Sequence, residues 1–248
     1  MMLKATIDTD TFRETIDVIA AMVTECRLTI SEQGIRTRAV DTANVAMISL
    51  ELDQEAFSSF LATAGELGID ITKMKNIVGM MGRGDVLSLD LPDDGHKMEM
   101  VFSGYKYSLT LLDVNTIRKE PSMPSIELPA KIKISGAALN DAIKAASVVS
   151  DKIALGVDPA ANFFYMEAEG DSDHIRLELG KDELIDLVPA EARSLFSLDY
   201  LKDMGRVMGR ADEVEVQIGI DHPVKFRFGI ADDNGRVEFL LAPRIEAD

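Results

Sequence analysis

The chain repeats itself with a period of 127 residues. Residues 81–85 (Met-Gly-Arg-Gly-Asp) return as residues 208–212 (Met-Gly-Arg-Ala-Asp), and the same offset places Ile7 on Ile134 and Lys75 on Lys202. A period near half of a 248-residue chain predicts two similar domains in tandem. We assign the domains to residues 1–114 and 131–248, joined by a connector at residues 115–130.

Short stretches of alternating apolar and polar residues dominate both halves. Residues 86–91 and 97–102 flank an Asp-Asp-Gly turn and predict a β-hairpin, with residues 107–111 as the next strand. The second half has the same pattern at residues 214–218, 224–228 and 237–241. Such alternation is typical of antiparallel strands with one buried face.

Four segments show helical spacing of apolar residues instead. The four stripes are Phe12, Ile16, Ile19 and Val23; Met74, Ile77, Val78 and Met81; Leu139, Ile143, Ala146 and Val149; and Leu201, Met204 and Met208. Thr72 and Asp199 are the predicted N-caps of the second and fourth helices. A weaker internal offset of 62 residues relates the first two stripes, so the α+β chain is expected to run strand, helix, three strands, four times over.

The connector contains three prolines, Pro121, Pro124 and Pro129. Proline excludes a helix interior and a central strand, so we expect an extended segment on the surface. It is either a plain linker or, because Ile126 and Leu128 would then leave apolar side chains on the surface, a docking segment.

Basic residues gather on one face of the predicted helices. Of twelve polar-side positions spaced four apart, seven are basic and one, Asp17, is acidic. The basic positions are Arg13, Lys75, Arg83, Lys144, Lys202, Arg206 and Arg210. Two interpretations stay open: an ordinary solvated face, or a surface that presents cations to a polyanion such as phosphate.

Composition narrows the function classes. With 26 basic and 43 acidic residues, the net charge of −17 argues against a simple basic nucleic-acid binder and favours a soluble surface. The single cysteine, Cys26, excludes an intramolecular disulfide and a cysteine zinc site, and is expected to be a small buried apolar residue. Because no signal sequence or apolar run of about 20 residues is present, we expect an intracellular protein without a membrane partner.

Motifs for catalysis are missing from the sequence. It has no phosphate-binding loop, dinucleotide fingerprint or nucleophile elbow, and none of its three histidines has a second ligand nearby. Its paired aspartates, such as Asp8 with Asp10, stand in apparent turns or before a helix, where they accept local backbone hydrogen bonds. We therefore expect no catalytic residue, no metal and no cofactor.

Three segments resemble recognisable stretches of the archaeal and eukaryotic sliding clamp family, the proliferating cell nuclear antigens. They are residues 241–246 (Leu-Ala-Pro-Arg-Ile-Glu), residues 38–41 with 44–47 (Arg-Ala-Val-Asp and Asn-Val-Ala-Met), and residues 194–201 (Ser-Leu-Phe-Ser-Leu-Asp-Tyr-Leu). The similarity extends from about Leu3 to Glu246.

The resemblance implies a DNA clamp fold and a homotrimeric ring around duplex DNA, with helices lining the hole and antiparallel sheets outside. The seven cations named above would face the DNA, although the first helix has little besides Arg13, and Asp17 would face the hole. Subunits would join through strands carrying Tyr107, Leu109 and Leu111 on one side and Ile175, Leu177 and Leu179 on the other.

The resemblance also implies an apolar pocket for partner peptides. Its residues would be Val40, Val45, Met47, Ile126, Leu128, Pro223, Leu240, Ala242, Pro243, Arg244 and Ile245. Expected partners are DNA polymerase, a clamp loader, flap endonuclease and DNA ligase, in the cytoplasm at the nucleoid, or in a eukaryotic nucleus. The chain would act as a processivity factor and moving platform. An acidic interaction scaffold that does not encircle DNA, and a carboxylate-dependent metal enzyme, remain as alternatives.

Overall fold

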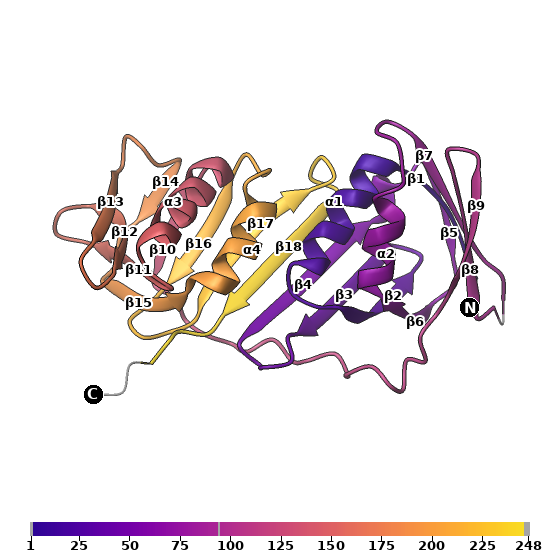
Figure 1. The fold of residues 1–248 in the computed structure, drawn as a ribbon, viewed down its shortest axis with the longest axis horizontal. Coiled ribbons are helices and arrows are strands. Elements are labelled where there is room, and N and C mark those ends of the chain that lie inside the picture. The colour runs from indigo at the N-terminus through magenta and orange to yellow at the C-terminus, as the bar shows by residue number, and fades with distance from the viewer. Residues whose placement is uncertain (1, 94, 246–248) are drawn as a thin grey trace. The chain divides into compact units, whose positions relative to one another are not determined.

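The computed structural model describes residues 2–93 and 95–245, which form two compact units of α+β architecture (Figure 1). The first unit comprises Met1–Thr42, Ile48–Ser122 and Gly229–Val237, and the second Ala43–Met47, Met123–Phe228 and Glu238–Asp248. Each unit contains two α-helices that lie over antiparallel strands. Among the described residues, no helix combines the length and the apolar character needed to cross a membrane.

The first half of the chain contains two helices and nine strands within the described residues. In chain order these are β1 (Leu3–Asp8), α1 (Thr9–Ala20), β2 (Glu25–Ser31), β3 (Gly34–Val40), β4 (Ala46–Asp53), the 3-10 turn η1 (Gln54–Ala56), β5 (Ser59–Ala62), β6 (Gly65–Asp70), α2 (Ile71–Val78), β7 (Val86–Leu91), β8 (Lys97–Phe102) and β9 (Tyr105–Thr110). Strands β5-β1-β7-β8-β9 form one sheet, and β4-β3-β2-β6 are consecutive neighbours in another.

The second half repeats this arrangement. Its elements are β10 (Ala130–Ile134), α3 (Gly136–Val149), β11 (Lys152–Asp158), β12 (Phe163–Glu169), β13 (His174–Gly180), β14 (Asp186–Val188), β15 (Ala192–Ser197), α4 (Leu198–Met208), β16 (Val214–Ile218), β17 (Val224–Ile230) and β18 (Gly235–Leu241). The strand orders β14-β10-β16-β17-β18 and β13-β12-β11-β15 match those of the first half, so β18 occupies the place of β9 and β13 the place of β4.

Alternating burial explains why these segments are strands. Along β7 every second residue is buried, and Leu87, Leu89 and Leu91 are at most 4% exposed. Each helix instead buries one stripe: in α3, for example, Leu139, Ile143 and Ala146 pack inward. Helices α1 and α2 pack together in the first unit, and α3 and α4 in the second. The apolar faces of sheets and helices thus form the core of each unit.

The predicted hairpin is confirmed, since β7 and β8 pair in antiparallel register with Leu89 opposite Met100. Its turn residue Asp94 lies outside the described residues. The pattern of strand, helix and three strands is incomplete, because β5 and β14 were not expected. Both are short edge strands, Ser-Phe-Leu-Ala and Asp-Leu-Val, with too few residues to show alternation.

Several predicted helix ends are wrong. Asp70, not Thr72, caps α2 by accepting a hydrogen bond from Lys73 N at 2.8 Å. Ser197 holds the N-cap position of α4, so Asp199 lies inside the first turn. Helix α1 ends at Ala20, which leaves Val23 beyond it. Cap positions depend on local hydrogen bonds that apolar periodicity does not report.

Candidate nucleic-acid and partner surfaces

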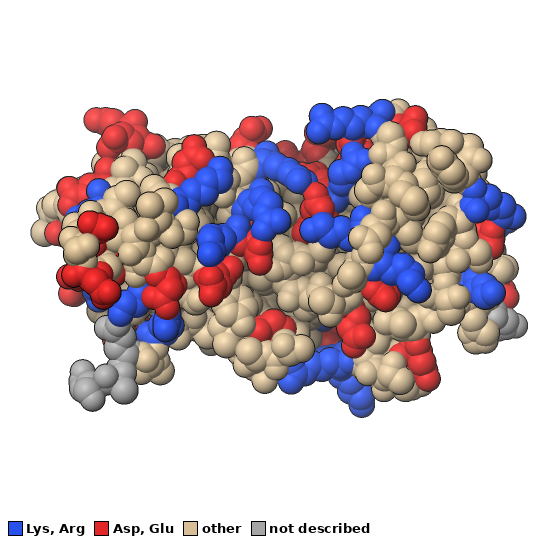
Figure 2. All heavy atoms as spheres, viewed as in Figure 1, with Lys and Arg blue, Asp and Glu red and all other residues tan. Residues whose placement is uncertain are grey.

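Helix α4 presents two cations opposite its buried stripe. Leu201, Met204 and Met208 are 0% exposed, whereas the side chains of Lys202 and Arg206 are 47% and 64% exposed. Because residues four apart share a helix face, both cations project on the same side. Figure 2 shows basic side chains over the helices of this unit, with carboxylates close beside them.

Helix α3 contributes one cation, Lys144, whose side chain is 64% exposed. One turn further along the same face, Val148 is 86% exposed. The second unit therefore brings Lys144, Lys202 and Arg206 onto solvent-facing sides of two packed helices.

Each of these three cations lies beside an aspartate three residues earlier in its helix. Lys202 Nζ is 3.1 Å from Asp199 Oδ1, Lys144 Nζ is 3.1 Å from Asp141 Oδ1, and Arg206 pairs with Asp203. Positions four apart on each helix do not include these carboxylates, so the predicted basic face left them out. The spacing Asp-x-x-Lys or Asp-x-x-Arg was visible in the sequence and places both charges on one face.

In the first unit, Arg13 is held by the end of the neighbouring helix. Its guanidinium donates to Met81 O at 2.7 Å and Val78 O at 3.4 Å, and it pairs with Asp10 at 2.8 Å. The side chain is only 25% exposed. Arg13 thus satisfies carbonyl groups at the C-terminus of α2, where a cation also complements the helix dipole.

Lys75 of α2 lies 3.9 Å from Asp17 of α1, and the Asp17 side chain is only 18% exposed. Asp17 therefore serves as a partner for Lys75, a role that apolar periodicity does not indicate. This contact joins the two helices of the first unit across their packed faces.

The interpretation that Arg83 and Arg210 extend the helical stripes is wrong. Helix α2 ends at Val78 with Gly79 as its C-cap, and α4 ends at Met208 with Gly209 as its C-cap. Glycine has a low helix propensity, and both arginines follow it in turns. They are exposed but do not belong to helical faces.

The predicted subunit-joining residues lie on two edge strands. Strand β9 ends the sheet β5-β1-β7-β8-β9, and β13 ends the sheet β13-β12-β11-β15. Tyr107 and Leu109 lie in β9, while Leu111 follows its end and was wrongly placed in the strand. Ile175, Leu177 and Leu179 lie in β13.

Leu177 is exposed on the apolar face of β13, between the half-buried Ile175 and Leu179. It pairs in register with Met166 of β12, which is 3% exposed, yet Leu177 itself is 37% exposed. The neighbouring Arg176 points to the other face, where it pairs with Glu167 and Glu178 and lies 4.2 Å over the ring of Tyr165. These carboxylates raise the pKa of Arg176, first through the hydrogen bond to Glu178.

The predicted peptide-pocket residues fall mostly in the second unit. Six of them are half-buried in that unit: Val45, Met47, Ile126, Pro223, Ala242 and Pro243. Val40 belongs to the first unit. Leu128 and Leu240 are only 6% and 8% exposed, so they contribute to the core rather than to an open surface. Ile245, in contrast, is 90% exposed.

Hydrogen bonds hold the segment before Ile245 in place. Ala242 N donates to Val45 O at 2.9 Å, and Arg244 N donates to Leu195 O at 2.6 Å. The Arg244 guanidinium pairs with Asp151 at 2.8 Å, and this hydrogen bond lowers the pKa of the Asp151 carboxyl below its usual value. Ile245 therefore follows an anchored segment. Glu246, the last residue of the motif, lies outside the described residues.

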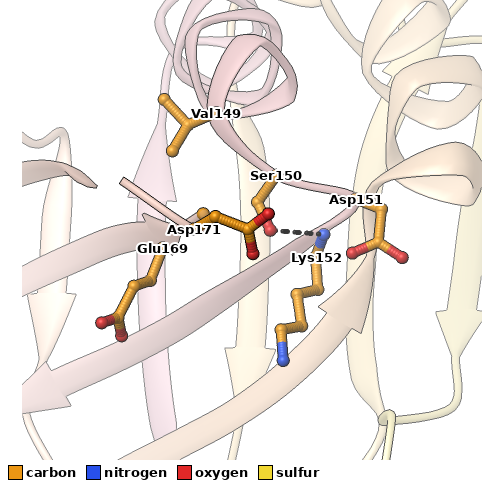
Figure 3. Close-up of a pocket in the computed structure, with 7 residues that line it drawn as sticks. Val149, Ser150, Asp151, Lys152, Glu169 and Asp171 are labelled. Atoms are coloured by element: carbon orange, nitrogen blue, oxygen red, sulfur yellow. Dashed lines mark hydrogen bonds between the residues drawn. The ribbon is translucent and has the colours of Figure 1, made fainter. Parts of the chain in front are cut away.

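A polar cavity of about 460 Å³ lies in the second unit beside the end of α3 (Figure 3). Its lining residues are Val149, Ser150, Asp151, Lys152, Glu169, Gly170 and Asp171. The Asp151 carboxylate is engaged by Arg244, and its lowered pKa makes it a poor proton donor near neutral pH. No group of three or more potential metal ligands occurs among the described residues.

Comparison with known proteins gives one consistent answer. The family described as Proliferating cell nuclear antigen, N-terminal domain, matches residues 2–117. The DNA polymerase sliding clamp of Methanoculleus marisnigri is 70% identical over 247 residues, covering 100% of both chains. That of Methanosphaerula palustris is 67% identical with the same coverage.

The fold agrees with these sequence matches. The solved structure titled "C-terminal region of FEN-1 bound to A. fulgidus PCNA" superposes with a TM-score of 0.93 at 33% identity, covering 99% of this chain and 100% of that chain. The matches define the class of protein as a DNA clamp, and they confirm the predicted α+β clamp fold.

The chain belongs to the proliferating cell nuclear antigen family, and its function is that of a DNA polymerase sliding clamp. This outcome favours the clamp prediction over the acidic scaffold and the carboxylate-dependent enzyme. The family consists of processivity factors.

Proposed function

We propose that three copies of this chain close into a ring around duplex DNA and tether DNA polymerase and other replication proteins to it. The supporting observation is the pair of edge strands, β9 and β13. In the repeat, β9 holds the place of β18 and β13 the place of β4, and both β9 and β13 lie at the edge of their sheet. We propose that β9 of one copy pairs with β13 of the next.

Such pairing is a head-to-tail contact, which generates a closed ring when the rotation between copies closes. It also removes two exposed strand edges, which are otherwise aggregation hazards. A ring of three copies of the 27.1 kDa chain has a native mass of about 81 kDa.

Native mass spectrometry of two matched variants tests the assembly. Leu177→Arg places a charge on the uncovered face of β13 and is expected to yield the 27.1 kDa monomer. Leu61→Arg, on the unrelated edge strand β5 and 58% exposed, is expected to leave the trimer intact. A trimer that survives Leu177→Arg, or is lost equally in both variants, would contradict the proposed interface.

The proposed DNA surface consists of the cations Arg13, Lys75, Arg83, Lys144, Lys202, Arg206 and Arg210. Lysine and arginine contact phosphates without reading base sequence, so binding is expected to be independent of sequence. Retention then depends on closure of the ring rather than on tight contact at any one site. Arg13 is the weakest member of the set, because its guanidinium is already bonded within the first unit.

Loading onto DNA of defined topology tests the encirclement. Clamp loaded onto nicked circular DNA is expected to remain bound through gel filtration and to dissociate when a single cut linearises the circle. Blocking both new ends with a bulky protein is the matched control and restores retention. Equal retention on open linear and circular DNA would contradict topological linkage.

Partner peptides are proposed to bind the half-buried apolar residues near the C-terminal segment of the second unit. The solved complex of the C-terminal region of FEN-1 with A. fulgidus PCNA supports peptide binding by this chain, and the exposed Ile245 beside the half-buried residues supports the proposed location. DNA polymerase, clamp loader, flap endonuclease and DNA ligase are expected to share the surface. Buried apolar anchors usually carry most of the affinity in such contacts.

A labelled C-terminal peptide of a flap endonuclease serves as the probe. Met47→Ala, at a half-buried position, is expected to weaken peptide binding by about tenfold, the effect of losing an apolar anchor of about 1.4 kcal/mol. Ile185→Ala, at a 54% exposed site elsewhere in the same unit, is the control. Equal affinity of both variants would place the peptide elsewhere.

We infer further that the chain catalyses no reaction and works in the cytoplasm at the nucleoid. The membership of a processivity-factor family supports the first inference. Turnover of nucleotide or DNA by the purified chain, or a location of a fluorescent fusion away from the nucleoid, would contradict these inferences.

A further inference from the structure

Most of the cations proposed to face DNA already have a carboxylate partner within the chain. Lys144, Lys202 and Arg206 pair with aspartates three residues earlier, as Arg13 does with Asp10. Lys75 reaches Asp17 across the α1–α2 contact at 3.9 Å. At least five of the seven cations thus share their surroundings with an acid, in both units of the chain.

The pairs in the second unit do little for folding. The side chains of Asp141, Asp199 and Asp203 are 76%, 81% and 52% exposed. Ion pairs at such exposure add little to stability, because their attraction in water is modest and is offset by the entropy cost of holding two long side chains in one geometry. The fully buried residues Leu201, Met204 and Met208 hold α4 in place without them. The carboxylates are therefore free to act on whatever approaches the helix surface.

Two effects weaken the binding of a phosphate at each pair. The phosphate has to replace the aspartate as the partner of the cation, and the displaced carboxylate stays close on the same helix turn. That carboxylate lies well inside the Debye length of about 8 Å, so salt does not remove its repulsion of the phosphate. A unit charge about 6 Å away in water changes affinity about threefold.

We propose that Asp141, Asp199 and Asp203 are positioning residues that weaken the grip of the clamp on DNA by holding the helix cations in internal ion pairs. The inference rests on the proposed function, because it assumes that α3 and α4 face the duplex. The cations give near-equivalent weak contacts, and the aspartates lower the cost of leaving each contact. The ring therefore stays on DNA by closure and moves along it readily.

The double variant Asp199→Asn/Asp203→Asn tests the proposal with the full-length trimer. Its matched control is Asp182→Asn/Glu191→Gln, which removes the same charge from two exposed residues in the loops that flank β14. Binding to a fluorescein-labelled 30-base-pair linear duplex is measured by anisotropy from 25 to 200 mM KCl.

The helix variant is expected to bind about tenfold more tightly than the unmodified chain at 50 mM KCl, from about threefold per carboxylate. The slope of log affinity against log salt is expected to steepen by up to about 0.9 for each cation released from its pair. The control variant is expected to shift affinity less than twofold and to leave the slope unchanged. On long DNA, one-dimensional diffusion of the helix variant is expected to be slower.

Unchanged affinity and slope in the helix variant, or the same increase in the control variant, would overturn the proposal. A purely structural role of the aspartates would lower the melting temperature without steepening the salt dependence. Failure of the proposed function is recognised separately. In that case the unmodified chain is not retained on circular DNA. If only this inference fails, the unmodified chain is retained on circular DNA, and the helix and control variants bind the linear duplex with the same affinity and salt dependence.

Discussion

Replacing Gly136 by alanine tests how closely the two helices of the second unit can approach. Gly136 begins α3, and its N–H donates to Ala211 O at 3.1 Å beyond the end of α4. A Cβ atom at this position would lie 1.9 Å from Met208 O and 2.6 Å from Ala211 O, both backbone atoms. Real Cβ contacts essentially never fall below 3.0 Å, so one helix has to move.

The repeat explains why glycine is needed only in the second unit. The equivalent residue in the first unit is Thr9, whose Oγ1 donates to Gly82 O at 2.7 Å. Helix α2 ends at Val78, whereas α4 continues to Met208, three residues past the equivalent position. The longer α4 brings backbone carbonyl groups to the space that the threonine side chain occupies in the first unit.

The expected cost of Gly136→Ala follows from these contacts. Overpacking against backbone costs about 1–3 kcal/mol, and a weakened hydrogen bond to Ala211 O costs about 0.5–1.5 kcal/mol. The lower entropy of an unfolded alanine offsets about 0.4–1 kcal/mol. A net loss of about 2.5 kcal/mol corresponds to a fall in melting temperature of roughly 5–10 °C for a chain of this size.

Thermal unfolding followed by circular dichroism measures the effect, with Gly205→Ala as the control. A Cβ at Gly205 meets the ends of two side chains, Ile143 Cδ1 at 3.0 Å and Asn140 Oδ1 at 3.1 Å, which can rotate away. We expect this variant to change stability by less than about 1 kcal/mol, since alanine also favours helix. The reasoning would be refuted if the melting temperature of Gly136→Ala equalled that of the unmodified chain, or was no lower than that of Gly205→Ala.

Three further predictions concern single side chains. Burial raises the pKa of the Cys26 thiol from 9.0 to about 12, so the contribution of the thiol to stability is complete below pH 9 and is lost as the pH rises towards 12. In urea titrations the chain is expected to lose about 1.4 kcal/mol of stability between pH 8 and 10 relative to Cys26→Ala, and parallel pH profiles of the two proteins would contradict this. Ala231→Gly is expected to stabilise the first unit by about 0.5–1 kcal/mol in the same titration, because Ala231 has a φ of 54°, which strains any residue with a Cβ atom, while its N–H donates a hydrogen bond to Glu14 that glycine keeps. A loss of stability would show that packing of the Ala231 methyl group outweighs this backbone strain. Arg13→Gln is expected to lower stability by about 1–2 kcal/mol because it removes the cap on α2, whereas unchanged stability with weaker DNA loading would restore Arg13 to the DNA surface.

Local patterns predicted much of the fold correctly. The β7–β8 hairpin follows from alternation on both sides of an Asp-Gly turn, and both strands have the predicted bounds. Helix ends were harder, because Asp70 and Thr72 are both good capping residues and only three-dimensional geometry selects Asp70. The short strands β5 and β14 exist because β1 and β10 offer them an edge, which periodicity within four or three residues cannot indicate.

The site was predicted less completely than the fold. The basic face was identified by positions four apart, and this choice hid Asp141, Asp199 and Asp203, which share the face at a spacing of three. Arg83 and Arg210 were added to the helices because the repeat aligns them, although the glycines before them end each helix. A repeat indicates equivalent positions, but their conformation depends on where each helix stops.

The paired charges change how the acidity of the chain is understood. A net charge of −17 is compatible with DNA binding if the acids lie far from the duplex, but here several lie on the helices that carry the cations. A protein that holds DNA by affinity alone would lose grip from such an arrangement. A ring held by closure needs only contacts weak enough to be exchanged as it moves, and on our proposal the cations paired within the helix supply contacts of that kind. The same carboxylates that would be a defect in an ordinary DNA-binding surface therefore suit a clamp that slides.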